Sequence, residues 1–162
     1  MFPENRPRRL RRTAGLRRMV RETAVAPDDL IYPLFIREGR SVKEPLAAMP
    51  GQMRYSPDTA AAAARQIADL NIPAVLLFGI PDSKDAVGSG AYDDHGIVQQ
   101  ACAAIKRACP DLMVITDVCL CEYTDHGHCG AIVERNGRRD VDNDATLPLL
   151  VNCGIIRQVQ FG

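Results

Sequence analysis

Three cysteines lie within one short segment of the chain. Cys119 and Cys121 are separated by a single residue, and Cys129 follows after seven more, among them Gly127. Residues i and i+2 of an extended chain point to the same side, so two thiols face one point and the third has enough chain to loop back. Three thiolates match zinc's preference for sulfur in a four-coordinate site, and they would leave the fourth position open to water or substrate.

Residue types alone leave other interpretations of this segment open. The spacing is not that of a zinc knuckle, and the cysteines could equally be reduced thiols in a loop or an oxidation-prone pair. His126 and His128 could complete a closed four-ligand site, although we expect them to surround the metal rather than bind it. Asp117 precedes the cysteines, where a carboxylate could orient a substrate amine, move a proton or simply cap a loop.

The elements that must position these residues alternate between strand and helix. A serine with a capping hydroxyl, Ser56, precedes a proline at the first helical position and an alanine-rich run. The alternation predicts parallel strands joined by right-handed crossovers, either in a doubly wound sheet or in part of a (β/α)8 barrel. Ligands gather beyond the carboxyl ends of the strands in both, which is where Asp117 and the cysteines fall. We expect strands over 30–36, 74–78 and 112–118, and helices over 57–70 and 96–108.

The flanking segments carry local signals of their own. Residues 1–27 are predicted to form an arm, and Pro45–Arg54 reads as a loop around Pro50-Gly51. Asn136-Gly137 is a two-residue hairpin signal. A helix is expected to begin within 142–150, and Pro148 should interrupt it, unless it lies in the first turn, because proline lacks the N–H that an α-helix needs.

Composition narrows the class of protein. The chain has 162 residues, 46% of them hydrophobic, and no formal net charge, which suits one globular domain. No apolar run approaches the roughly 20 residues of a membrane span, and no secretory signal is evident, so we expect a cytoplasmic protein with reduced cysteines and no membrane partner. Arginines crowd the first 21 residues, but no aromatic residues are interleaved with them and no known reader motif accompanies them, so we expect no nucleic-acid partner.

Several separated motifs resemble, in order, those of the zinc-dependent branch of the porphobilinogen synthase (5-aminolevulinate dehydratase) family. The segment TDVCLCEYTDHGHCG at Thr116–Gly130 is similar almost letter for letter to the family's metal segment, and it keeps the three cysteines that some other members replace. The resemblance runs from about Arg6 to Leu147. The other matching stretches are RPRRLRR at Arg6–Arg12, DLIYPLFI at Asp29–Ile36, MPGQMRYS at Met49–Ser56, VLLFGIP at Val75–Pro81 and GRRDVDNDAT at Gly137–Thr146.

This resemblance implies a fold, a reaction and a set of site residues. The expected fold is α/β: an N-terminal arm over 1–27, the first three to four units of a (β/α)8 barrel over 28–147, and a divergent tail over 148–162. The family condenses two molecules of 5-aminolevulinate into porphobilinogen for heme synthesis, and it assembles as octamers through the arm. Carried over by position, the Zn2+ ligands are Cys119, Cys121 and Cys129, and the active-site aspartate is Asp117. Some relatives also bind Mg2+.

The sequence departs from the family in two ways. The family forms Schiff bases with two lysines in its second half, whereas the only lysines here are Lys43, Lys84 and Lys106, and Lys84 reads as an ordinary loop lysine. The stretch after Leu147 resembles nothing in the family and suggests a truncated chain. We therefore expect a porphobilinogen synthase that is inactive alone. The alternatives are a non-catalytic zinc-binding remnant or subunit-interaction protein, and an NAD-type module, against which Asp93 stands where G-x-G-x-x-G needs glycine.

Overall fold

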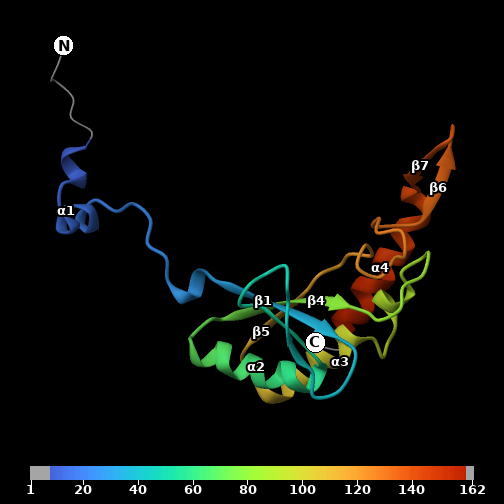
Figure 1. Ribbon diagram of the computed structural model, residues 1–162, viewed down its shortest axis with the longest axis horizontal. Helices are drawn as coiled ribbons and strands as arrows, with labels where there is room; N and C mark the ends of the chain where they lie inside the picture. Colours follow the sequence, from blue (N-terminus) through green and yellow to red (C-terminus); the bar gives the residue numbers. More distant parts are fainter. Residues whose placement is uncertain (1–7, 160–162) are drawn as a thin grey trace, which may run out of the picture.

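A five-stranded mixed sheet organises the computed structural model, which describes residues 8–159 (Figure 1). Strands β1 (Ile31–Arg37), β4 (Ala74–Ile80) and β5 (Met113–Thr116) lie side by side in chain order and pair in parallel. Strand β3 (Met53–Tyr55) pairs in parallel with β1, and β2 (Lys43–Pro45) pairs antiparallel with β3 at the edge. The order β2-β3-β1-β4-β5 is that of an open sheet.

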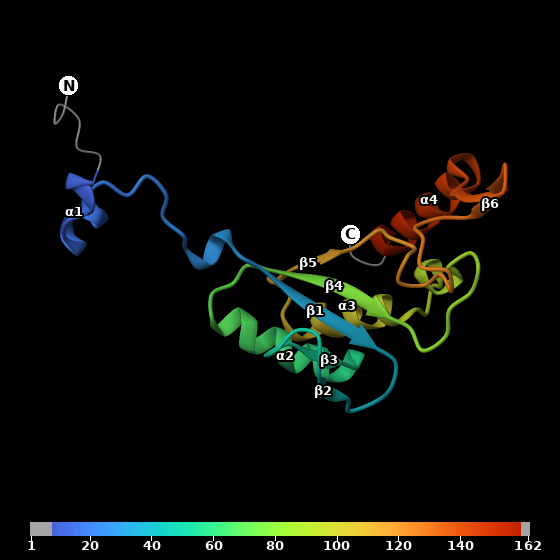
Figure 2. The ribbon, with the colours of Figure 1, turned by 45° about the horizontal axis from the view of Figure 1, so that its top comes forward.

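Two helices, α2 (Pro57–Asp69) and α3 (Ile97–Ala108), pack against each other and cover one face of this sheet (Figure 2). Leu34 and Leu77 are buried beneath them and belong to the main hydrophobic core. Phe35 and Phe78 alternate to the opposite face, where their rings stack 5.6 Å apart and stay half-buried. Helices on one face only differ from a doubly wound sheet, which is covered on both.

The structure confirms most of the predicted elements and corrects others. Residues 45–54 were expected to form a loop, but Pro45 ends strand β2, and Met53 and Arg54 belong to strand β3. Each of these strands has only three residues, which is too short for a recognisable sequence pattern. Strand β5 ends at Thr116, two residues earlier than expected, because the chain turns toward the cysteines. Ser56 is the N-cap of α2, but its hydroxyl makes no capping bond: it accepts from the Val42 N–H and donates to Asp58.

The C-terminal part of the described chain forms a hairpin and a helix. Strands β6 (Ile132–Arg135) and β7 (Arg138–Val141) flank Asn136 and Gly137, whose φ angles of 54° and 72° confirm the predicted two-residue turn. Helix α4 (Asn143–Val159) runs through Pro148, so the predicted interruption is wrong. The proline removes one helical N–H, and the packing of neighbouring apolar side chains offsets that loss. Leu149, Leu150 and Cys153 pack in a second cluster with Ala91, Leu120 and Tyr123.

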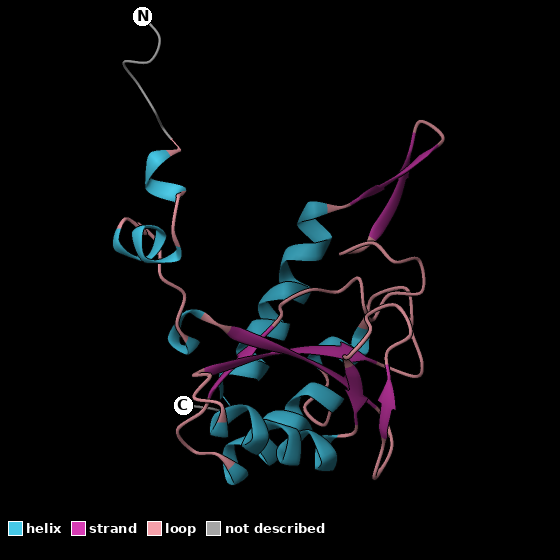
Figure 3. Ribbon diagram, turned by 60° about the vertical axis from the view of Figure 1, so that its left-hand side comes forward, coloured by secondary structure: helices cyan, strands magenta, loops and turns pink. Residues whose placement is uncertain are grey.

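The segment before β1 extends away from the sheet (Figure 3). It contains a 3-10 turn, η1 (Arg9–Arg11), a short helix, α1 (Ala14–Met19), and a second 3-10 turn, η2 (Pro27–Asp29), and its side chains are almost all exposed. The first residues of the predicted arm, and the last of the predicted tail, lie outside the described residues. Within residues 8–159, no helix has the length and apolar character needed to cross a membrane.

Candidate metal centre

The structure brings the three predicted cysteines together. The Sγ atom of Cys119 lies 3.0 Å from Sγ of Cys121 and 3.3 Å from Sγ of Cys129. The Leu120 N–H donates to Sγ of Cys129 at 3.3 Å, an interaction that favours a negatively charged sulfur. Cys119 and Cys121 are half-buried and Cys129 is exposed, so the cluster faces solvent on one side.

This cluster lies just beyond the carboxyl end of the sheet. Thr116, the last residue of β5, pairs with Leu77 of β4, and the Asp117 N–H donates to the Leu77 carbonyl at 3.5 Å. Asp117 is half-buried and stands two residues before Cys119. The predicted aspartate and the predicted thiols therefore share the edge at which parallel α/β folds bind their ligands.

The loop that follows β4 pairs with the cysteine segment, by which we mean residues 119–129. Asp85 of this loop forms an isolated parallel bridge with Thr124 of the cysteine segment. The Asp85 N–H donates to the Tyr123 carbonyl at 3.2 Å, and the Asp125 N–H donates to the Asp85 carbonyl at 3.0 Å. Because Tyr123 is only 2% exposed, this pairing fixes the middle of the segment between Cys121 and Cys129.

The two histidines have different surroundings. His126 Nε2 lies 3.1 Å from the Ala86 carbonyl, and Nδ1 of the same ring accepts from the His128 N–H at 3.1 Å. Both ring nitrogens of His126 are thus occupied, which argues against His126 as a metal ligand in this conformation. The His128 ring lies 5.7 Å from that of His126, and its side chain is exposed.

Three cysteine sulfurs are a ligand set that suits zinc, although the sulfurs lie closer together than they would around a bound zinc ion. Zn–S bonds of about 2.3 Å in a tetrahedron separate the sulfurs by roughly 3.8 Å. The observed separations of 3.0 and 3.3 Å are shorter, and within residues 8–159 no group of three or more His, Cys, Asp or Glu has metal-holding geometry. Burial, and then the hydrogen bond with Cys121, raises the pKa of the Cys119 thiol to about 12. A bound cation would replace the shared protons and open the cluster by under about 1 Å.

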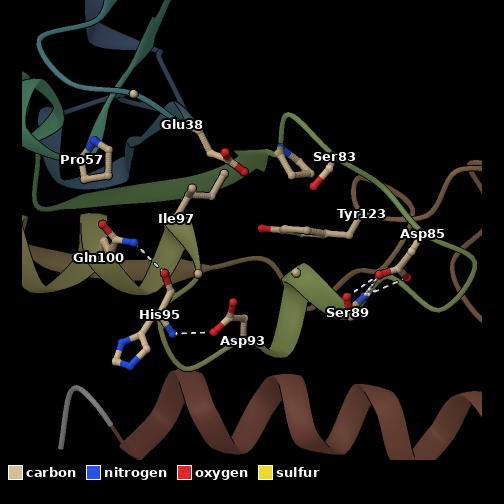
Figure 4. Close-up of a pocket in the computed structure, with 14 residues that line it drawn as sticks. Glu38, Pro57, Ser83, Asp85, Ser89, Asp93, His95, Ile97, Gln100 and Tyr123 are labelled. Atoms are coloured by element: carbon tan, nitrogen blue, oxygen red, sulfur yellow. Dashed lines mark hydrogen bonds between the residues drawn. The ribbon is translucent and has the colours of Figure 1, made fainter.

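A cavity of about 490 Å³ adjoins this edge, on the side of the helix N-termini (Figure 4). Tyr123 and Asp85 line it and also belong to, or pair with, the cysteine segment. The Asp85 carboxylate accepts from the hydroxyl and N–H of Ser89 and from the Val87 N–H, and the Ser89 hydroxyl is the main reason that the pKa of Asp85 is lowered. Neither Asp85 nor Tyr123 was predicted from the sequence as a site residue. The three glycines of the loop over 79–94 were the available signal, because glycine permits close approach.

The fold and the site together define a class: an α/β protein that gathers thiols and a carboxylate at the carboxyl edge of a parallel sheet. The family model "Delta-aminolevulinic acid dehydratase" matches residues 4–160, so the match extends beyond Leu147, where the resemblance was expected to end. A Synechocystis delta-aminolevulinic acid dehydratase is 52% identical over 155 residues, which cover 96% of this chain and 47% of the relative. That of Ruminiclostridium josui is 49% identical, over 90% of this chain and 69% of the relative.

A solved structure agrees with these relatives. The delta-aminolevulinic acid dehydratase (porphobilinogen synthase) of Toxoplasma gondii, in complex with the reaction product porphobilinogen, superposes with a TM-score of 0.86 at 32% identity, over 97% of this chain and 44% of that one. The chain belongs to the delta-aminolevulinic acid dehydratase family, a family of lyases. It spans about half the length of the first curated relatives that it matches.

Proposed function

We propose that this chain supplies the zinc-binding half of a porphobilinogen synthase active site, which condenses two 5-aminolevulinate molecules with loss of water. The observation that carries the proposal is the convergence of Cys119, Cys121 and Cys129 beyond the carboxyl end of β5. Two features support a partial (β/α)8 barrel: β1, β4 and β5 lie in chain order, and α2 and α3 cover one face only.

The residues of this chain would have distinct tasks in that reaction. The three thiolates would hold zinc, which when bound supplies a Lewis acid for a substrate oxygen. Asp117, at the same edge, would hold the amine of 5-aminolevulinate as an ammonium group or accept a proton from it. The covalent step needs amines that form Schiff bases, and none of the three lysines corresponds to the lysines that the family uses. We therefore propose that these 162 residues do not form porphobilinogen unaided.

The N-terminal arm, which precedes the sheet, would join this chain to other subunits. Residues 8–26 extend away from the sheet, and their arginines are exposed (Figure 1). We propose that this arm docks on a neighbouring subunit in a homo-oligomer, an octamer in the family, within the cytoplasm. Mg2+ could be a second metal, as in some relatives, but we assign no residue of the described chain as its ligand.

Complementation tests the proposed function. The purified chain is incubated with zinc and 5-aminolevulinate, either alone or with the separately produced C-terminal half of the Synechocystis relative, and porphobilinogen is measured. We expect product only from the mixture, and none when the chain carries Cys119→Ala. Product from the chain alone would refute the claim about the lysines. A chain that binds zinc but gives no product with the added half would favour a non-catalytic zinc-binding or subunit-interaction protein.

A further inference from the structure

The main chain just before Cys129 is held from both sides. The His128 N–H donates to Nδ1 of His126 at 3.1 Å, and the His128 carbonyl accepts from the Thr124 hydroxyl at 2.8 Å and from the Gly130 N–H at 3.1 Å. Thr124 is 1% exposed, so the second anchor is rigid. The residue that carries the third thiol therefore follows a residue, His128, whose main-chain N–H and carbonyl are both hydrogen-bonded.

The partners of His126 define its tautomer. A carbonyl oxygen only accepts, so the 3.1 Å contact with Ala86 requires a hydrogen on Nε2. The His128 amide only donates, so Nδ1 must keep its lone pair. His126 is thus a neutral Nε2–H imidazole that links the loop after β4 to the cysteine segment. Gly127, at φ +74°, makes the reversal that lets the ring reach back to the next residue's amide.

We propose that His126 is a positioning residue for the metal centre: it fixes the main chain at His128, so that Cys129 stays close to the sulfur of Cys119. The inference rests on the proposed zinc site, because positioning matters only if Cys129 is a ligand. His126 acts through main-chain atoms and not through the metal, since both of its nitrogens are engaged elsewhere. Thr124 holds the carbonyl of the same residue, His128, which belongs to the peptide that joins it to Cys129.

Three substitutions in the full chain separate the two hydrogen bonds. His126→Ala removes both, and we expect zinc affinity, measured by chelator competition, to fall about 10- to 100-fold, as for groups that orient metal ligands. His126→Asn keeps an acceptor for the His128 N–H and should recover most of that loss. His126→Gln can place its amide N–H where Nε2 donates to the Ala86 carbonyl, but it does not place an acceptor at the Nδ1 position, so it should recover less. The control is His95→Ala, because the hydrogen bonds at this exposed histidine use its main chain.

Two spectroscopic measurements keep the test independent of overall stability. Long-range ¹H–¹⁵N spectra of the reduced, metal-free chain should show His126 as the Nε2–H tautomer, and an Nδ1–H tautomer would overturn the proposal. Cobalt substituted for zinc reports sulfur ligation through thiolate charge-transfer absorption, which should weaken in His126→Ala and not in His95→Ala.

The outcomes distinguish this inference from the proposed function. If wild-type chain binds zinc through three sulfurs and His126→Ala binds it equally well, the positioning role is wrong and the zinc site stands. If wild-type chain binds no zinc, the proposed metal centre itself fails, and the positioning role fails with it.

Discussion

The hydroxyl of Tyr123 lies directly against Gly79, near the end of β4. A Cβ added at Gly79 would overlap that hydroxyl and stand only 2.8 Å from Cζ of the ring. Gly90 approaches another edge of the same ring, where an added Cβ would lie 3.2 Å from Cδ1. Tyr123 therefore packs the cysteine segment against the sheet, in space left by a glycine of β4 and a glycine of the following loop.

Enlarging Gly79 should disturb this contact. We predict that Gly79→Ala lowers the free energy of unfolding by about 1–3 kcal/mol, because Tyr123 has no room to move within a packed cluster. Chemical denaturation measures the change. Gly15→Ala is the matched control, because the nearest atom to its added Cβ is 3.9 Å away and it lies in the exposed helix α1. Equal stability of Gly79→Ala and wild type would show that the tyrosine is not packed as described.

The two faces of the sheet should differ in their contribution to stability. Leu77 is fully buried against α2 and α3, whereas its neighbour Leu76 points to the half-exposed face. We predict that Leu77→Ala costs about 2–5 kcal/mol in the free energy of unfolding, from lost transfer free energy and a cavity. Leu76→Ala should cost only about 1 kcal/mol, because the side chain stays partly in water. Similar costs for the two variants would mean that the second face is covered in solution.

Acid should weaken the start of α2. The Asp58 carboxylate accepts from the Ser56 hydroxyl at 2.6 Å and from the Ser41 N–H, and these bonds, the hydroxyl first, lower the pKa of Asp58. Because the pKa of Asp58 is lower in the folded state, the ionised carboxylate stabilises the fold at pH values above the unfolded pKa of about 3.9. This stabilisation is lost as the pH falls through the folded-state pKa.

Thermal unfolding across pH tests this expectation. Wild type should have a higher Tm than Asp58→Asn at pH 7, and the difference should shrink as the pH falls below the unfolded pKa of about 3.9. Ser56→Ala removes the hydroxyl that contributes most to lowering the pKa of Asp58, so the Tm of this variant should depend less on pH than that of wild type. A Tm difference between wild type and Asp58→Asn that stays constant from pH 7 to pH 2 would contradict the assignment.

Local patterns predicted the elements that local chemistry determines. Continuous apolar runs located β1 and β4, and the Asn136-Gly137 pair located the hairpin, since only certain residues accept positive φ at both turn positions. The i, i+2 spacing of Cys119 and Cys121 likewise predicted that two sulfurs converge, which the structure confirms.

Features that depend on distant partners were not readable from the sequence. The bridge between Asp85 and Thr124, the seat of Tyr123 and the His126 contact with Ala86 each join segments about 40 residues apart. Pro148 shows the same limit, because tertiary packing of Leu149, Leu150 and Cys153 overrides a local helix-breaking preference. The assignment of zinc and of Asp117 rests on residue types, position and family membership, and it stays a prediction.

The most direct test is the zinc content of the purified, reduced chain together with its six single Cys→Ala variants. We predict one zinc per wild-type chain, loss of that zinc in Cys119→Ala, Cys121→Ala and Cys129→Ala, and full retention in Cys102→Ala, Cys109→Ala and Cys153→Ala. Cys102 and Cys109 pack in the main hydrophobic core, and Cys153 packs in the second hydrophobic cluster. Absence of zinc from the wild-type chain, or its retention when any of the three clustered cysteines is removed, would contradict the account.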